Sequence, residues 1–185
     1  MKIEKTPLAD CYLIHDTLHG DHRGYFFESF NRKTFLTETG IDIDFVQDNQ
    51  SKSQKGVLRG LHFQEGEHAQ AKLVRVLQGS VLDVVVDLRK NAATFGKSFS
   101  VELSEDNHQQ LFIPRGFAHG FVVLSETAVF FYKCDNYYHK ASERGIIFND
   151  KQLSIDWRLA DTDLILSDKD KVLPTFQEIA DSLKF

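Results

Sequence analysis

KGVLRGLHFQEGEHAQAKLVRVLQG, residues 55–79, places charged and polar side chains between short apolar runs. The apolar residues predict one strand over 57–63 and a second over 72–77. Arg59, His62 and Lys72 interrupt these strands. Charges that are buried or half-buried in a sheet are costly unless they are paired or bind a ligand. We therefore predict that the two strands line an anion-binding pocket that contains a base.

The sequence does not decide whether Arg59 and His62 lie on the same face of their strand. Strict alternation along a strand places the two side chains on opposite faces. Gly60 lies between them and can host a bulge, which would bring both to one side of the sheet. A shared pocket therefore requires an irregularity at Gly60.

Composition indicates one globular, β-rich protein. The chain has 185 residues, of which 42% are apolar, and 16 Phe and 5 Tyr against 3 Pro suit a β interior. The net charge of −5 makes a general nucleic-acid surface unexpected, so an anion site must be a local cationic cluster. With two cysteines, no apolar signal core in residues 1–14 and no run of membrane-spanning length, we expect a cytoplasmic protein that does not enter a membrane.

Strand signals recur at short spacing on both sides of the opening stretch. Residues 79–89 are mostly apolar and β-branched, which predicts a central strand buried on both faces. Residues 20–30 predict a turn followed by alternation, with Tyr25 and Phe27 on one face and Phe26 and Glu28 on the other. The remaining strand signals fall in residues 10–14, 45–53 (running into a polar loop), 94–104, 109–125 (two strands around a Pro-x-Gly turn) and 127–138. This pattern predicts a sandwich or barrel.

Two short helices complete the prediction. Residues 31–40 predict a helix that Asn31 caps and Gly40 closes. Residues 150–172 are polar and irregular, and residues 174–185 show helical spacing at Phe176, Ile179 and Leu183. With no repeat and no linker, residues 1–185 are expected to form a single domain.

His62 and Lys72 are the first candidates for chemistry. A lone histidine on a strand is more often structural, but an imidazole with a pKa near ~6.5 among cations is a usable base. Lys72 reads either as a solvated edge lysine or as a fixed cation for a developing oxyanion. Asp83 is a candidate buried partner for Lys72. Because Asp83 and Asp87 share a face, a turn cap or a pair with Arg75 or Arg89 remains an alternative.

The segment IPRGFAHGF, residues 113–121, contains the Pro-x-Gly-x-x-His pattern of small jelly-roll barrels that hold metals, with His119 as its last member. Those barrels also need a His-x-His and a later Glu. This chain has His62-Phe63-Gln64 and then Lys72, which are poor ligands for a divalent ion. The barrel pattern is retained and the metal set is broken, so we expect no metal.

Other polar and aromatic residues support the pocket less directly. Tyr132 reads either as a core tyrosine or as a proton donor, because its phenol is protonated at neutral pH. Arg23, Glu28, Gln47 and Asn49 each read as surface residues. As a set, this cation, carboxylate and two amides would suit the phosphates and base of a nucleotide.

In order and with compatible spacing, these segments resemble the dTDP-4-dehydrorhamnose 3,5-epimerase family, in the nucleotide-sugar epimerase branch of the cupins. The resemblance covers about residues 3–175, and the final helix is less characteristic. The segments that carry it are DHRGYFFE (21–28), FVQDNQSKS (45–53), GVLRGLHFQ (56–64), QAKLVRVLQGSVLDVVVDLR (70–89), IPRGFAHGFVVLS (113–125), YKCDNYY (132–138) and LSDKD (166–170).

The resemblance implies a mainly β, cupin-type jelly-roll barrel (a double-stranded β-helix), a homodimer and no cofactor. It implies epimerisation at C3 and C5 of dTDP-4-dehydro-6-deoxy-D-glucose, on the way to dTDP-L-rhamnose. The chain also lacks a Gly-rich dinucleotide fingerprint, so no redox cofactor is expected.

Carried over residue by residue, the resemblance implies a role for each matching position. His62 looks like the base, Asp170 its dyad partner, Tyr132 the acid on the opposite face and Lys72 the cation that stabilises the enolate. The positions that match substrate-binding ones are Arg59, His119 and Lys169 for sugar and phosphates, Gln47, Asp48, Asn49 and Glu143 nearby, and Arg23 and Glu28 for the nucleotide, reaching across the dimer.

Four other functions remain open from the sequence. The nearest alternative is an epimerase of the same branch that inverts only C3, or only C5. Related ketoisomerases move the keto group between ring carbons instead. A nucleotide-sugar sensor would bind dTDP without exchanging a proton, and a metal-dependent cupin oxygenase would lose activity on chelation.

Overall fold

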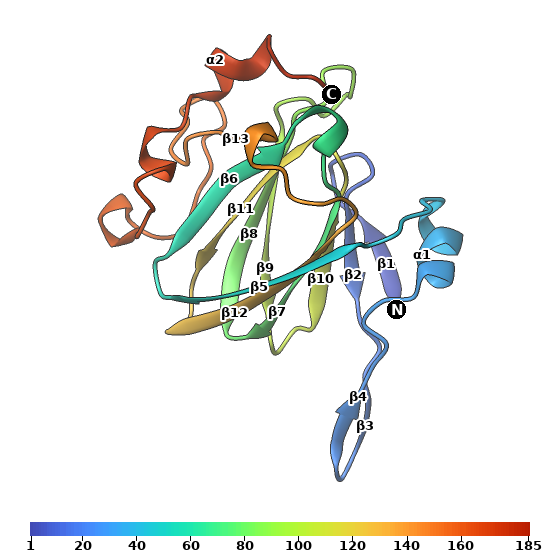
Figure 1. The fold of residues 1–185 in the computed structure, drawn as a ribbon. Helices are drawn as coiled ribbons and strands as arrows, with labels where there is room; N and C mark the ends of the chain where they lie inside the picture. The colour runs from blue at the N-terminus through green and yellow to red at the C-terminus, as the bar shows by residue number, and fades with distance from the viewer.

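Two antiparallel β-sheets face each other in the computed structural model, which describes residues 1–185 (Figure 1). The larger sheet has the strand order β1 (Lys2–Lys5), β2 (Tyr12–His15), β10 (Gln109–Ile113), β7 (Lys72–Gln78), β12 (Thr127–Cys134) and β5 (Gln47–Gln54). The smaller sheet has the order β13 (Glu143–Gly145), β6 (Leu58–Gln64), β11 (Phe117–Val123), β8 (Ser80–Asp87) and β9 (Ser98–Ser104). This is the predicted jelly-roll barrel.

The core between the sheets draws apolar residues from both. Val74 and Phe130 of the larger sheet belong to the same buried cluster as Val85 and Phe121 of the smaller sheet. Alternation along each strand points these side chains inward, and burying one such side chain stabilises the fold by about 1.5–3 kcal/mol. From β6 onward the chain passes from one sheet to the other at each connection, except that β8 and β9 are neighbours in the smaller sheet. The opening stretch therefore contributes β6 to one wall and β7 to the other.

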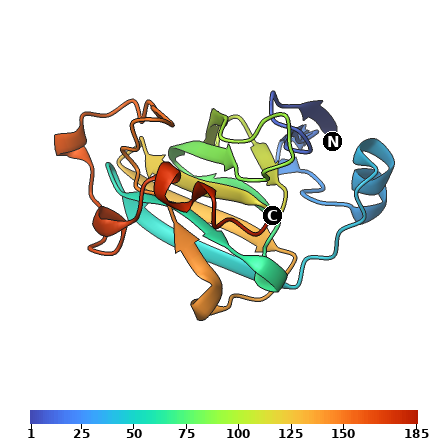
Figure 2. The same cartoon turned by 90° about the horizontal axis from the view of Figure 1, so that it is seen from above.

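The C-terminal segment covers the outer face of the smaller sheet (Figure 2). Val84 and Val86 of β8 pack there in one buried cluster with Trp157, Phe176 and Leu183. From Val81 to Asp87, β8 is therefore buried on both faces, which confirms the prediction for residues 79–89.

The C-terminal helix is shorter than predicted. Thr175 caps α2 (Phe176–Ala180) through a capping box with Glu178. The helix then stops, because the Ser182 backbone N–H and hydroxyl both donate to the carbonyl of Ile179 and tighten the last turn. Leu183 still reaches the core, but from a turn and not from the helix.

The N-terminal region covers part of the larger sheet. Asn31 accepts a hydrogen bond from the Thr34 backbone N–H at the start of α1 (Arg32–Thr39), and Gly40 closes the helix, as predicted. Phe35 of this helix packs on Phe112 of β10, with ring centroids 4.8 Å apart. The helix lies at the β1 side of the barrel (Figure 1).

A short hairpin, β3 (His19–Asp21) and β4 (Gly24–Phe26), projects away from the barrel (Figure 1). Tyr25 and Phe27 lie on one side of it, as predicted, with ring centroids 5.9 Å apart. The strand itself ends at Phe26, so residues 27–30 do not continue the predicted alternation. Tyr25 and Phe26 are 59% and 71% exposed, which is unusual for large aromatic residues and makes the hairpin a candidate binding surface.

The strand predicted in residues 45–53 is present as β5, and its polar end stays in the sheet where a loop was predicted. β5 pairs with β12 along its whole length, with Gln47 opposite Cys134 and Gln54 opposite Thr127. As an edge strand it alternates between the barrel interior and solvent, so polar residues are tolerated throughout. No helix of the protein has the length and apolar character needed to cross a bilayer.

Candidate active site

A cavity of about 600 Å³ opens between the two sheets. It is lined by strands from both walls and by the C-terminal tail, and it contains most of the residues that the sequence singled out. Those are Asn49, Arg59, His62, Lys72, His119, Tyr132, Lys169 and Asp170. Its size suits a small organic ligand.

His62 and Asp170 form a hydrogen-bonded pair although 108 residues separate them in sequence. Nε2 of His62 lies 2.6 Å from Oδ1 of Asp170. Burial raises the pKa of Asp170, but hydrogen bonds from His62, from Ser167 and from the Gly60 backbone outweigh it and hold that pKa below its ordinary value. Asp170 is therefore ionised at neutral pH, and Nε2 of His62 donates to it. The other ring nitrogen, Nδ1, is then the one left to accept a proton.

The C-terminal tail positions Asp170 through backbone hydrogen bonds to the residues at the start of β6. The backbone N–H of Ile165 donates to the carbonyl of Gly56 at 2.8 Å, and the N–H of Leu58 donates to the carbonyl of Ile165 at 3.0 Å. From this anchor the tail runs along the cavity to a 3₁₀ turn at Asp170–Val172. These polar, irregular residues are thus fixed by backbone bonds to β6.

A bulge in β6 settles the orientation of Arg59 and His62. His119 of β11 pairs with His62 and Phe121 pairs with Arg59, so β6 holds one extra residue between the two pairs. Both side chains line the same cavity as a result. Gly60 has a φ of +133°, and a Cβ there would lie 2.5 Å from the Cα of Gly120, so only glycine fits.

We expect Gly60→Ala to destabilise the protein by at least about 3 kcal/mol, because backbone strain is added to the clash with Gly120. The measurement is the free energy of unfolding in urea. Gly24→Ala is the matched control, since Gly24 has a φ of +127° but nothing within 4 Å of the added Cβ. That variant should lose only about 1–2 kcal/mol. Equal losses in the two variants would contradict the close packing of β6 on β11.

Lys72 and Tyr132 stand on neighbouring strands of the opposite wall. Nζ of Lys72 lies 5.7 Å from the centre of the Tyr132 ring. Burial lowers the pKa of Lys72 and raises the pKa of Tyr132. The phenol therefore remains protonated at neutral pH and can donate a proton. Because His62 belongs to the smaller sheet and Tyr132 to the larger one, the two face the cavity from opposite sides.

Asp83 does not pair directly with Lys72. Its Oδ2 lies 2.9 Å from Nε2 of His119. Asp87 pairs with Arg89, one of the alternatives open from the sequence, at 2.9 Å.

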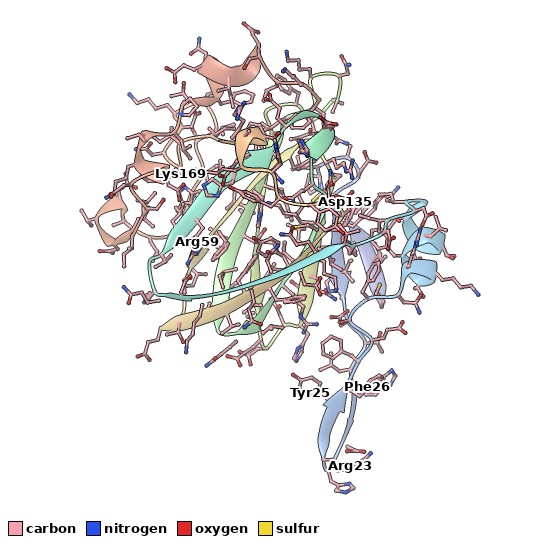
Figure 3. All side chains as sticks on the ribbon, in the orientation of Figure 1. Arg23, Tyr25, Phe26, Arg59, Asp135 and Lys169 are labelled. Atoms are coloured by element: carbon pink, nitrogen blue, oxygen red, sulfur yellow. The ribbon has the colours of Figure 1, made fainter.

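The cationic side of the cavity is formed by Arg59 and Lys169 (Figure 3). Nε and Nη2 of Arg59 donate to the hydroxyl of Ser53 at 3.2 and 3.1 Å, which fixes the guanidinium. Nζ of Lys169 lies 2.6 Å from a carboxylate oxygen of Glu143, whose other oxygen accepts from the Tyr138 hydroxyl at 3.0 Å. Hydrogen bonds to Lys169 and Tyr138 lower the pKa of Glu143 against the effect of its burial.

Ser53 and Tyr138 received no role from the sequence. Tyr138 belongs to the segment YKCDNYY (132–138), but its 51% exposure cannot be predicted from the sequence.

Gln47 and Asn49 of β5 lie beside this cavity, whereas Asp48, which stands between them in the sequence, does not. Nε2 of Gln47 donates to Oδ1 of Asn49 at 3.1 Å, and Asn49 lines the cavity. Asp48 alternates to the outer side of the strand, where both its oxygens accept from Nζ of Lys133 at 3.0 Å. The Asp48 carboxylate is therefore directed away from the cavity.

Arg23 and Glu28 are not among the residues that line the cavity. Arg23 stands at the tip of the projecting hairpin, where it pairs with Asp21 (Figure 3). Within one chain, the structure does not bring the predicted nucleotide-binding residues together with the catalytic candidates. No group of three or more His, Cys, Asp and Glu side chains is arranged to hold a metal ion.

Comparison with known proteins gives a consistent result. The family model described as dTDP-4-dehydrorhamnose 3,5-epimerase matches residues 5–178. The Escherichia coli K12 protein of that name is 52% identical over 179 residues, which are 97% of this chain and 96% of that one. The crystal structure of the Elizabethkingia anophelis dTDP-4-dehydrorhamnose 3,5-epimerase superimposes with a TM-score of 0.94 at 60% identity, covering 96% of this chain and 97% of that one.

A second solved structure, from Legionella pneumophila, contains dTDP-4-keto-L-rhamnose. It superimposes with a TM-score of 0.93 at 48% identity and covers 98% of this chain and 96% of that one. These similarities confirm the cupin-type jelly-roll fold.

Proposed function

This chain belongs to the dTDP-4-dehydrorhamnose 3,5-epimerase family, and we propose that the cavity between its two sheets is the catalytic site. The protein is an isomerase that epimerises C3 and C5 of dTDP-4-dehydro-6-deoxy-D-glucose and yields dTDP-4-dehydro-L-rhamnose, for dTDP-L-rhamnose biosynthesis. The observation that carries the site assignment is the His62–Asp170 pair at 2.6 Å, facing Tyr132 and Lys72 in one cavity.

His62 removes the proton in this proposal. C3 and C5 are both bonded directly to the carbonyl carbon C4, so the hydrogen on each becomes acidic once the enolate is stabilised. Asp170 fixes Nε2–H of His62, leaves Nδ1 unprotonated toward the cavity and supports the imidazolium that forms. The lowered pKa of Asp170 keeps this arrangement at neutral pH.

Lys72 and Tyr132 complete the inversion. The ammonium of Lys72 provides a fixed positive charge for the enolate oxygen in a partly desolvated site. Tyr132, on the wall opposite His62, returns a proton to the other face of the carbon. Removal from one face and return to the other inverts the centre without a redox step.

The cationic and amide residues hold the nucleotide end of the substrate. The guanidinium of Arg59, fixed by Ser53, can bind diphosphate oxygens in pairs, and Lys169 adds a second charge. His119 contacts the sugar from the cavity wall. We assign Gln47, Asn49 and Glu143 to the nucleoside end of the substrate, because Asn49 lines the cavity, Gln47 donates to Asn49, and Glu143 pairs with Lys169.

Deuterium uptake from heavy water tests this function. The enzyme is incubated with dTDP-4-dehydro-6-deoxy-D-glucose, and label is located by NMR. We expect deuterium at both C3 and C5 and the L-rhamno product. Label at C3 alone would establish the single-inversion alternative, and a moved keto group would establish a ketoisomerase. Nucleotide binding without any label would overturn the catalytic assignment.

We propose that the enzyme is a homodimer in which each hairpin enters the partner's site. The hairpin of β3 and β4 carries Arg23, Tyr25 and Phe26, which are exposed and do not line the cavity between the sheets of their own chain. Exposed aromatic residues beside an arginine suit a nucleotide base and phosphates. In a two-fold dimer, both hairpins could be used equivalently.

Mixed dimers test the sharing of sites. His62→Ala and Arg23→Ala are each expected to be poorly active, but a mixed dimer has one cavity with His62 that receives Arg23 from the other chain. Random mixing should restore about a quarter of the wild-type rate, since half of the dimers are mixed and each has one intact site. Mixing His62→Ala with Tyr132→Phe is the control, because each cavity then keeps one defect. A mixture no more active than its parents would contradict the shared site.

We place the enzyme in the cytoplasm. Cys11 and Cys134 are both buried and unpaired, as expected for a protein of a reducing compartment. Fractionation of growing cells, followed by detection of the protein with an antibody in each fraction, checks this assignment.

A further inference from the structure

Asp83 is a buried carboxylate behind the cavity wall that the proposed mechanism does not use. It lies on β8, is wholly buried, and accepts a hydrogen bond from His119 through one oxygen only. Its other oxygen, Oδ1, has no hydrogen-bond partner. An unsatisfied buried carboxylate oxygen is costly, so its presence next to an active site calls for a function.

Lys72 is the nearby cation that lacks a partner. Four titratable groups face it: Asp83 from β8, Tyr132 and Cys134 from β12, and Glu143 from β13. None of them forms a salt bridge with Lys72, and two of them are neutral at pH 7, because burial raises the pKa of Tyr132 and raises that of Cys134 to about 11.

The two carboxylates that face Lys72 differ in their other commitments. Glu143 is already paired with a different cation, since one of its oxygens lies 2.6 Å from Nζ of Lys169. Asp83 has only the single contact with His119. It is therefore the main uncommitted negative charge beside Lys72.

The charges of Asp83 and Lys72 depend on each other. Burial raises the pKa of Asp83 and lowers the pKa of Lys72, and each group opposes the shift of the other. Removing either charge would leave the other group buried without compensation, and it would then tend to become neutral.

We propose that Asp83 is a positioning residue whose negative charge keeps Lys72 protonated for enolate stabilisation, while its hydrogen bond holds His119 at the cavity wall. This inference rests on the proposed role of Lys72. Asp83 does not line the cavity, so it acts through Lys72 and His119 without touching the sugar.

Asp83→Asn separates charge from shape. The amide has the same size, and its oxygen can still accept from Nε2 of His119, so only the charge is lost. We expect kcat to fall at least about tenfold, as for a weakened oxyanion stabiliser. The basic limb of the kcat–pH profile should move down by about one pH unit, because Lys72 then loses its proton at lower pH. The affinity for dTDP should not change.

Asp87→Asn is the matched control. Asp87 lies on the same face of β8 and is equally buried, but it pairs with Arg89 and Thr94 outside the cavity. It should lower the melting temperature and leave the pH profile unmoved. If the Asp83→Asn profile is unmoved as well, Asp83 is only structural and the proposal is wrong.

A second measurement covers the case in which Asp83→Asn does not fold. In the Lys72→Gln variant, the carboxyl ¹³C signal of Asp83 should titrate at higher pH than in the wild type, because the compensating cation is gone. An unchanged midpoint would overturn the proposal.

The Lys72→Gln variant also separates two kinds of failure. If it retains full turnover, the proposed role of Lys72 is wrong. If it is inactive while neither the Asp83 midpoint nor the Asp83→Asn profile moves, only the present inference fails.

Discussion

His62→Ala is expected to abolish deuterium uptake at both C3 and C5 while the variant still binds dTDP with nearly wild-type affinity. One base serves both carbons in the proposed mechanism, and general-base catalysis contributes about 10²–10⁴-fold. In the same proposal the nucleotide is held by Arg59, Lys169 and the amides of β5, which the substitution leaves in place. NMR of the recovered keto sugar and calorimetric titration with dTDP measure the two effects.

The control for this variant is His15→Ala. His15 also pairs with a carboxylate, at 3.0 Å from Glu4, but it lies at the end of β2 and does not line the cavity. Its removal should leave exchange unchanged. Uptake that persists in His62→Ala at either carbon would mean that another base acts there.

Tyr132→Phe is expected to reduce product formation about 10²-fold and to reduce proton removal much less. The phenylalanine ring preserves the packing beside Lys72 and Phe130, so the enolate can still form on the His62 side. Without the phenol, the proton returns from the face it left, and exchange continues without inversion. The ratio of exchange to turnover, measured in heavy water, reports this separation directly.

Tyr12→Phe is the control for the loss of a phenol, because Tyr12 is buried on β2 away from the cavity. It should change neither rate. If exchange and product formation fall equally in Tyr132→Phe, Tyr132 is not the donor and another group returns the proton.

Local sequence patterns predicted the walls of the site well. Arg59, His62 and Lys72 stood out because they interrupt apolar strands, and those strands were predicted to be walls of a sandwich or barrel. The N-cap Asn31 and the C-cap Gly40 of α1 could also be predicted, because capping depends on residues next to the helix in sequence. The prediction for α2 was wrong only at its C-terminal end, where the Ser182 side chain closes the helix early.

Long-range features could not be predicted in this way. Asp170 reaches His62 only because the tail pairs with Gly56 and Leu58. No sequence pattern near Asp170 predicts that contact. The bulge at Gly60 was foreseen as a possibility, but it depends on the close approach of Gly120 from another strand. β5 was mistaken in part for a loop because an edge strand tolerates polar residues on both faces.

The attachment of the tail to β6 has a consequence for how the enzyme is made. Every strand of the barrel precedes residue 146, whereas Asp170 arrives later along the chain. During synthesis the two sheets can therefore close around a cavity that already contains His62, Lys72 and Tyr132 but has no dyad. The His62–Asp170 pair forms last, when residues 163–170 have left the ribosome and the tail has bonded to Gly56 and Leu58.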